Sequence, residues 1–375
     1  MAGDLRPLQR APLLVLGFLG LLIGVGAGLA RLGYRVPDVA ASAAASHGPL
    51  MIGGFFGVVI ALERAVAIGR YWAYLGPLLG GLSTVAAIAG APLGEAWLLA
   101  AAGIVFLAAS IDVWRRQRAL FTLTLALGAA CWPVGSLLWA AGLAVHDVVT
   151  WWLAFLILTI AGERLELSRF LPPSPTARRA FVAIVGVIFA GLLAFASPAG
   201  APLFALGLLA LSAWLLKQDI ARRTVRKQGL TRFIAVCLLS GYGWLAVGAV
   251  TMLAGGFVPG SRSHDAALHA LALGFVFSMV FGHAPIILPA VLRVTIRYHW
   301  SFYVPLALLH ASLALRVAGD AADRFDWTRG GGMLNAVALA AFIVGTAAAV
   351  LRARQRGPLQ DAPAATPGPG GPTRT

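Results

Sequence analysis

Charged residues are scarce in this sequence: they make up 11% of its 375 residues, while hydrophobic residues make up 59%. An ordinary soluble domain carries about 25% charged residues, so this composition excludes one. Acidic residues are rarer than basic residues, with 14 Asp and Glu against 29 Lys and Arg. Lysine is nearly missing, with only Lys217 and Lys227, and the arginines lie in short links between apolar runs. This pattern is typical of membrane topology, so we expect no nucleic-acid partner.

Cysteine and the common catalytic motifs are also lacking. Cys131 and Cys237 both lie inside apolar runs, which excludes a disulfide framework or a cysteine-based zinc site. The sequence contains no Walker-type loop, no G-x-S-x-G, no H-E-x-x-H and no C-x-x-C. These absences leave histidine as the residue type that can carry chemistry.

The sequence is rich in long apolar runs. A helix needs about 20 apolar residues to cross about 30 Å of hydrocarbon, and the runs predict an all-α polytopic bundle of about twelve transmembrane helices. We expect residues 1–356 to form this domain and residues 357–375, rich in Pro, Gly and Ala, to be a disordered cytoplasmic tail. The first run is too long for a signal peptide, so we interpret it as a retained helix. The expected spans are 11–30, 47–68, 73–90, 95–114, 119–142, 148–168, 179–196, 200–216, 233–255, 264–290, 299–318 and 331–351.

The distribution of cations predicts the orientation. Arginine and lysine are concentrated in the links after even-numbered spans, most of all in residues 217–232, and cation-rich links are cytoplasmic. Links after odd-numbered spans hold fewer cations, and the last of them also carries Asp320, Asp323 and Asp326. We therefore expect a multi-pass protein of the plasma (inner) membrane, surrounded by lipid, with both termini in the cytoplasm.

Five of the seven histidines fall in the outer half of this topology. Ionisable residues inside a bilayer are costly and generally face a bundle interior or a cavity, so the outer group is a candidate site. Interhelical hydrogen bonding or helix capping is the alternative interpretation. In a regular helix His269 and His283 would lie near one face and about 21 Å apart, too far to share one metal ion. The outer histidines are His47, His146, His264, His269 and His310, and the inner ones are His283 and His299.

A weak repeat relates the second and sixth spans. His47 is followed sixteen residues later by Glu63-Arg64, and His146 seventeen residues later by Glu163-Arg164. The tenth span repeats the outer histidine, so the chain could consist of three four-helix units. For the Glu-Arg pairs we favour the interpretation that they are anchors whose charges reach the inner headgroups.

Two segments resemble a known family. The stretch HGPLMIGGFFGVVIALERAVA from His47 and the stretch HALALGFVFSMVFGHAPIILPAVL from His269 resemble the NnrS family, membrane haem proteins associated with nitric oxide stress. Histidines on the second and tenth of twelve spans are also similar to haem–copper oxidase subunit I. The resemblance implies that His47 and His269 are axial haem ligands and that Met51 lines the same pocket.

Depth and helix spacing add two further candidate ligands. Counted at about 1.5 Å per residue, His310 lies within a turn or two of the His47 level, so it is the reserve ligand. The spacing of His269 and His283 is similar to that in the cytochrome b family, where one helix offers a histidine to each of two haems. Neutral imidazole is the usual haem ligand, and we expect haem b. Small residues such as Gly53, Gly57 and Gly274 would let a flat macrocycle approach the backbone.

Departures from the oxidase pattern limit the prediction. The sequence has no His-Pro-Glu-Val run, no adjacent His-His pair and no His-x-His on the tenth span, so we do not expect oxygen reduction. A copper ion beside the haem would need His146, His264 or His310 as ligands. No soluble redox domain is present, so electrons would come from a quinol or from another protein.

Two other functional classes stay open. A proton-coupled secondary transporter would share the twelve helices and the weak repeat, and would use Glu63, Glu163 and His283 as proton or substrate groups. A structural subunit of a membrane complex would use its Phe, Trp and Gly faces for packing against lipid or another chain. Whether the protein is an enzyme is also open at this stage.

Overall fold

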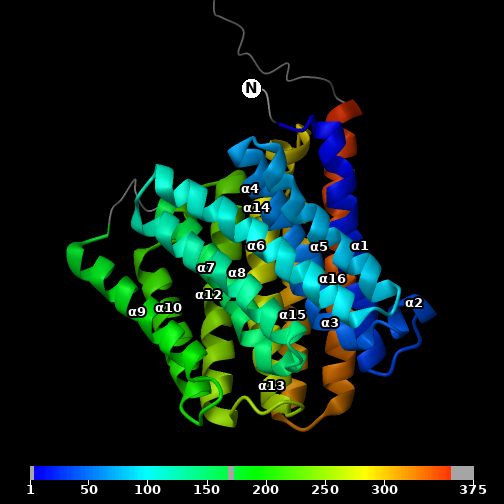
Figure 1. Cartoon of the computed structure of the whole chain (residues 1–375), viewed down its shortest axis with the longest axis vertical. Helices are drawn as coiled ribbons and strands as arrows, with labels where there is room; N and C mark the ends of the chain where they lie inside the picture. The colour runs from blue at the N-terminus through cyan, green and yellow to red at the C-terminus, as the bar shows by residue number, and fades with distance from the viewer. Residues whose placement is uncertain (1–3, 168–172, 356–375) are drawn as a thin grey trace, which may run out of the picture.

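Helices account for all the regular structure in the part of the chain that the structure describes, residues 4–167 and 173–355 of a computed structural model (Figure 1). Eleven helices within these residues are long and apolar enough to cross a membrane. The expected all-α polytopic bundle is therefore confirmed. The predicted tail 357–375 lies outside the described residues.

The helices follow the expected spans in order along the chain. Two segments, labelled η2 and η5, are π-helical, and each continues without a break between two α-helices. The bounds are α1 Pro7–Arg31, α2 Asp38–Ala41, η1 Ala44–Ser46, α3 His47–Pro49, η2 Leu50–Gly57, α4 Val58–Ile68, η3 Tyr71–Tyr74, α5 Leu75–Ile88, α6 Pro92–Arg116, α7 Leu120–Ala140, α8 Val145–Leu167, α9 Pro175–Leu193, α10 Gly200–Gln218, α11 Ala221–Thr224, α12 Gly229–Gly255, α13 Arg262–His269, η5 Ala270–Phe277, α14 Ser278–Leu292, η6 Trp300–Phe302, α15 Tyr303–Ala321 and α16 Phe325–Gln355.

The third expected span is shorter than the sequence suggests. Helix α5 has 14 residues, which at 1.5 Å per residue gives about 21 Å, less than the hydrocarbon thickness of about 30 Å. The 3-10 turn η3 takes up the start of the apolar run. Gly90, with a φ of 69°, follows the end of the helix in the left-handed conformation that glycine adopts without strain.

Three helices that occupy equivalent places in the proposed repeat meet in the middle of the bundle. We call the continuous helix α3–η2–α4 the His47 helix and the continuous helix α13–η5–α14 the His269 helix. Helix α8 packs against η2 and η5, and α4 packs against α14. Among the candidate spans α8 has the largest buried share, 78% of its apolar window. This contact brings the second, sixth and tenth long segments together. The division into three four-helix units stays a prediction.

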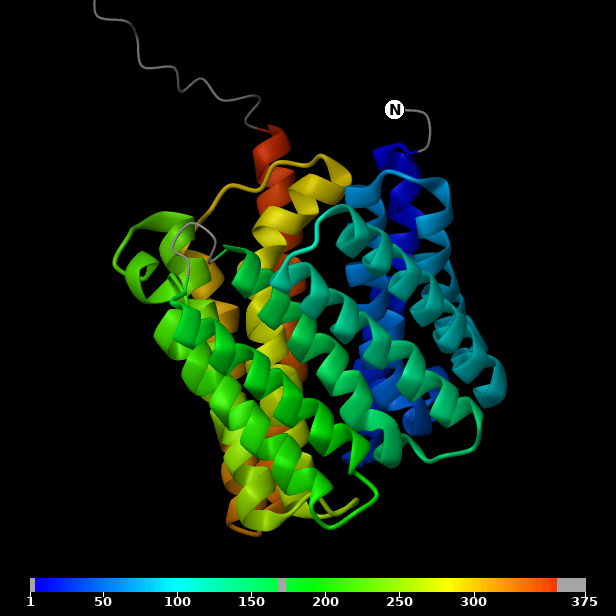
Figure 2. The same cartoon turned by 60° about the vertical axis from the view of Figure 1, so that its left-hand side comes forward.

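The two ends of the bundle carry different parts of these helices. The start of α1 and the end of α16 lie at the same end as α4 and α14, as Figures 1 and 2 show. The short helices α3 and α13, which carry His47 and His269, lie at the opposite end. The described termini therefore share one end, as the predicted topology requires, while the cytoplasmic position of that end stays a prediction.

Helix α1 lies against the His47 helix through a row of glycines. A Cβ atom on Gly20 would come within 2.9 Å of the Gly54 backbone, and one on Gly24 within 2.8 Å of Met51 Sδ. Such small residues let two membrane helices approach closely. Near its start, α1 also contacts the His269 helix, because the buried Arg10 donates through Nη1 to the Val291 carbonyl at 3.0 Å. Helix α1 thus joins the two histidine-bearing helices.

Candidate functional site

The rings of His47 and His269 lie next to each other. Their centroids are 6.4 Å apart and their planes differ by 20°. The two histidines come from segments of the chain more than two hundred residues apart. His269 directly precedes the π-segment η5, and His47 lies three residues before the π-segment η2. The structure therefore brings together the two residues that the family resemblance names as axial ligands.

Both histidines have the same tautomer, because Nδ1 of each faces a backbone carbonyl. His47 Nδ1 lies 2.7 Å from the Gly24 oxygen, and His269 Nδ1 lies 2.8 Å from the Asp265 oxygen. A carbonyl only accepts, so each Nδ1 carries a proton and donates it, and in the neutral form of each ring the lone pair is on Nε2. Within residues 4–167 and 173–355 neither Nε2 makes a hydrogen bond. A carbonyl on one ring nitrogen and a free lone pair on the other is the usual arrangement of a metal-binding histidine.

The spacing of the two rings fits one metal ion between them. An imidazole nitrogen binds a metal ion at about 2.0–2.1 Å, so two rings on opposite sides of one ion have centroids about 6.3 Å apart. The observed value is 6.4 Å. No group of three or more His, Cys, Asp or Glu able to hold a metal occurs in the described part of the chain. Two protein ligands are enough for a haem, because the porphyrin supplies the remaining four.

The His47 and His269 helices run side by side in register. Phe55 and Phe277 each lie eight residues after the histidine of their own helix, and their rings stack at 6.0 Å with an angle of 11°. Phe56 also contacts Phe277 at 4.8 Å. Each of the three phenylalanines belongs to a π-segment of eight residues. π-helical segments are rare in proteins, and those that occur are often at functional sites. Their presence here supports the choice of this part of the bundle as the candidate site.

The π-segment η5 changes the expected relation between His269 and His283. The expectation that His269 and His283 share a face assumed 3.6 residues per turn throughout. In η5 the hydrogen bonds run from i to i+5, which widens the turn, so that assumption is wrong for residues 270–277. His283 lies in α14 with its Nδ1 2.7 Å from the Met279 carbonyl, and α14 continues through Pro285 and Pro289 to Leu292.

The glycines next to the histidines serve helix packing. A Cβ on Gly53 would meet Leu99 at 2.5 Å, one on Gly57 would meet Trp132 at 2.5 Å, and one on Gly274 would meet Trp244 at 2.4 Å. Side chains of α6, α7 and α12 therefore occupy the space that these glycines leave. The expectation that this space admits a macrocycle is wrong at these three positions.

An ion pair holds the His269 side of the site. The Asp265 carboxylate accepts two hydrogen bonds from Arg316, both at 2.9 Å, and one of its oxygens lies 3.3 Å from His269 Nδ1. The Arg316 side chain is only 8% exposed. Asp320 lies on the same helix as Arg316 and accepts a hydrogen bond from Thr328 at 2.9 Å. This network was not predicted from the sequence, although the spacing of four residues between Asp265 and His269 indicates that the two side chains are neighbours on one helix.

The His47 side is held by close packing. A Cβ on Gly28 would lie 2.8 Å from Cε1 of His47, so only glycine fits there without a shift. Ser46, the residue before His47, donates to Glu95 Oε2 at 2.6 Å. Glu95 is fully buried, and its other oxygen has no hydrogen-bond partner in the described residues.

The other histidines lie apart from this pair. Both ring nitrogens of His310 are engaged, Nδ1 by Trp244 and Nε2 by Ser240, each at 2.9 Å. His264 packs its ring on Phe257 at 4.4 Å. His146 is 47% exposed beside Asp147, and His299 caps the short helix η6.

At the opposite end of the bundle, Arg164 forms a buried ion pair. Its Nε donates to Asp219 at 2.7 Å, and the two side chains are 4% and 1% exposed. Tyr242 donates to the same carboxylate at 2.7 Å. The expectation that the Glu-Arg pairs reach the headgroups is therefore wrong for Arg164. Glu63 and Glu163 lie close enough for their charges to interact, so the two inner pairs face each other.

Comparisons with known proteins give a family and no characterised relative. No curated protein and no solved structure matches the chain. A family model, described as a domain of unknown function (DUF8744), matches residues 10–351. This range includes His47, His269 and nearly all of the described helices. The chain therefore belongs to the DUF8744 family.

Proposed function

We propose that this protein is an integral membrane haem protein in which His47 and His269 bind the iron of one b-type haem. The observation that carries the proposal is the pair of imidazole rings 6.4 Å apart, each with Nδ1 hydrogen-bonded to a carbonyl. Imidazole can bind iron in its neutral form, which suits a site in a membrane protein because an ionised group would be costly inside the bilayer. His283 and His310 are not ligands in this proposal, because His283 lies in the other half of its helix and both ring nitrogens of His310 are hydrogen-bonded.

The arrangement favours electron transfer over substrate binding at the metal. His47 and His269 would hold the haem iron, and a haem held by two histidines would supply electron transfer. The carbonyls of Gly24 and Asp265 fix the ring orientations in advance. The electron donor in this proposal is a quinol or a redox protein, and the chemistry served is respiratory or linked to nitric oxide.

Absorption spectra test the proposal. Detergent-purified protein, first air-oxidised and then reduced with dithionite, should show the α-band of a b-type haem. His269→Ala and His47→Ala should each remove most of that band. His283→Ala is the matched control, because that histidine also binds the carbonyl four residues before it but lies in the other half of the helix. Purified protein without iron, or equal haem content in the double variant, would refute the proposal.

The orientation in the membrane is a separate part of the proposal. We infer that the end with both termini faces the cytoplasm, because the cation-rich link 217–232 lies at that end. A cysteine at Arg223 should then react only with reagents added from the cytoplasmic side. A cysteine at Gly260 should react only from outside, and the reversed result would overturn the orientation.

Proton-coupled transport is the second candidate, supported by the interacting carboxylates Glu63 and Glu163. Replacing both by Gln should abolish uptake if transport is the function, while the protein stays folded. The same double variant should keep its haem if the first proposal holds. Loss of the haem band in this variant would instead place these carboxylates in the haem site and would contradict a role for them in transport.

A further inference from the structure

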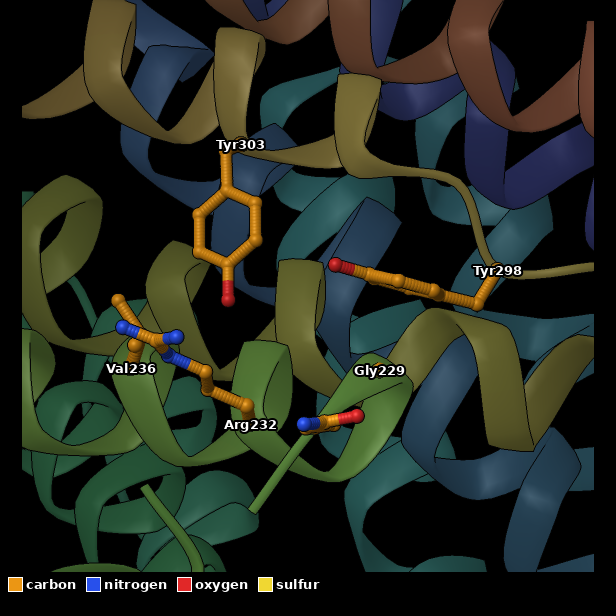
Figure 3. A pocket seen from close by; sticks show the side chains of 6 residues that line it. Gly229, Arg232, Val236, Tyr298 and Tyr303 are labelled. Atoms are coloured by element: carbon orange, nitrogen blue, oxygen red, sulfur yellow. The ribbon is translucent and has the colours of Figure 1, made fainter. Parts of the chain in front are cut away.

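A cavity of about 520 Å³ opens at the end of the bundle opposite the histidine pair (Figure 3). It lies between the first turns of α12, the segment that precedes η6 and the start of α15. Its lining consists of Gln228, Gly229, Arg232, Val236, Tyr298 and Tyr303. This volume is within the usual range for small-molecule sites, about 300–1,000 Å³.

The cavity has positive groups with no acidic partner. Arg232 makes no ion pair or hydrogen bond with the described residues, and it is exposed. Helix α12 begins here and is 27 residues long, and Gln228 at its N-cap provides no side-chain hydrogen bond to the first turn. The first N–H groups of α12 are thus left with a partial positive charge at the cavity.

Two phenols add hydrogen-bond donors at fixed positions. The hydroxyl groups of Tyr298 and Tyr303 point into the space in front of Arg232, as Figure 3 shows. The ring of the buried Phe233 holds both, with centroid distances of 6.4 Å to Tyr298 and 5.2 Å to Tyr303. A guanidinium, two hydroxyls and a helix N-terminus therefore converge on one space.

The positive charge around the cavity also favours binding of an anion. The chain has no Asp or Glu between Asp219 and Asp265, and Asp219 is already paired with Arg164. The link before α12 carries four further cations, Arg222, Arg223, Arg226 and Lys227. Arginine, helix N-termini and hydroxyl groups are the groups that bind phosphate.

We propose that this cavity binds a phosphate group, held by Arg232, the first turn of α12 and the hydroxyls of Tyr298 and Tyr303. The site lies at the first turn of a membrane-spanning helix, where lipid headgroups are found. Basic pockets between membrane helices bind anionic lipid headgroups in this way. The source of the phosphate is an anionic phospholipid or a free phosphate from the aqueous side. This proposal does not depend on the haem.

Lipid titration followed by native mass spectrometry tests the site. Purified protein in a neutral detergent is titrated with phosphatidylglycerol, with phosphatidylcholine and with pyrophosphate. Phosphatidylglycerol should bind saturably and more tightly than phosphatidylcholine. Arg232→Gln should weaken that binding at least about tenfold, as expected for loss of a charge-assisted hydrogen bond. Arg226→Gln, in the link before α12 and outside the cavity lining, should weaken it less than about threefold.

A second variant keeps the test independent of any folding defect. Tyr298→Phe with Tyr303→Phe retains both rings and should also weaken binding about tenfold. Pyrophosphate that competes with the same dependence on Arg232 would assign the site to free phosphate. Pyrophosphate without effect would assign it to the lipid. Equal binding before and after Arg232→Gln, equal binding of the two lipids, or no binding at all would overturn the proposal.

Discussion

The His47 helix and the His269 helix are built alike but hold their histidines in different ways. Each has a histidine, an eight-residue π-segment and a phenylalanine eight residues after the histidine. On the His269 helix the carbonyl that binds Nδ1 belongs to the same helix, four residues earlier. On the His47 helix it belongs to Gly24 of α1. One ring is oriented locally and the other by tertiary packing.

This difference shows where each half of the site is vulnerable. His269 keeps its carbonyl as long as its own helix is formed, and the Asp265–Arg316 ion pair then fixes that helix to α15. His47 keeps its carbonyl only while α1 stays in place. We therefore expect charge substitutions to damage the His269 side and steric substitutions to damage the His47 side.

The largest effect should follow from Asp265→Ala. It leaves the buried Arg316 without its carboxylate, and removal of one partner of a buried ion pair costs about 3–5 kcal/mol in the free energy of unfolding. Thermal unfolding in detergent measures the loss. Arg262→Ala is the control, because Arg262 pairs with Asp323 while both side chains are exposed, and it should change little. A second change, Arg316→Met, should restore most of the stability, and no recovery would count against the ion-pair explanation.

Gly28→Leu should have the next largest effect, on the His47 side. The new side chain would collide with the His47 ring, and overpacking of this kind costs about 1–3 kcal/mol. It should also reduce haem content strongly, because His47 would lose its position. Gly186→Leu serves as the control, since nothing lies within 4 Å of a Cβ at Gly186. Full haem content in Gly28→Leu would show that α1 does not position His47.

A smaller effect should appear in the contact between the two π-segments. Phe55→Leu and Phe277→Leu, alone and together, form a double-mutant cycle for the stacked rings. We expect a coupling free energy of about 0.5–1.5 kcal/mol, as for other aromatic pairs. Phe55→Leu with Phe342→Leu should be additive, because Phe342 stacks on Phe281 instead. If the free-energy changes of Phe55→Leu and Phe277→Leu were also additive, the stacked rings would not couple the two helices.

The smallest effect should come from Glu95→Gln. The amide keeps an oxygen that accepts the Ser46 hydroxyl, so the free energy of unfolding should change by no more than about 0.5 kcal/mol. Chemical unfolding and the absorption spectrum should both be close to those of the natural protein. A large loss of stability would show that the carboxyl group has an ionic role beside His47.

Hydropathy was sufficient to predict eleven of the twelve expected spans, because lipid requires a crossing segment to be a long apolar helix, and it failed at the short helix α5. The proximity of His47 and His269 was also predicted, from the positions of these two residues on the second and tenth spans. The π-segments could not be predicted, since LMIGGFFG and ALALGFVF contain nothing that separates i to i+5 from i to i+4 bonding.

Buried ion pairs were the second gap. Arg164 was interpreted as an anchor because adjacent Glu and Arg at a helix end usually reach water. Its partner, Asp219, is in a different link, and only the tertiary structure brings them together. Asp219 is the one acidic residue in the cation-rich link 219–228, and this was the signal that pointed to the pair.

The contact between Arg10 and the Val291 carbonyl spans 281 residues of sequence, and this has a consequence for biosynthesis. At about 5–20 residues per second, a ribosome needs roughly 15–60 s to make the chain between these two points. For that time α1 can pack its glycine row against the His47 helix, but the tenth helix, which carries His269, is not yet made. Assembly of the site is therefore a late event, and a nascent chain arrested before residue 269 should be unable to form it.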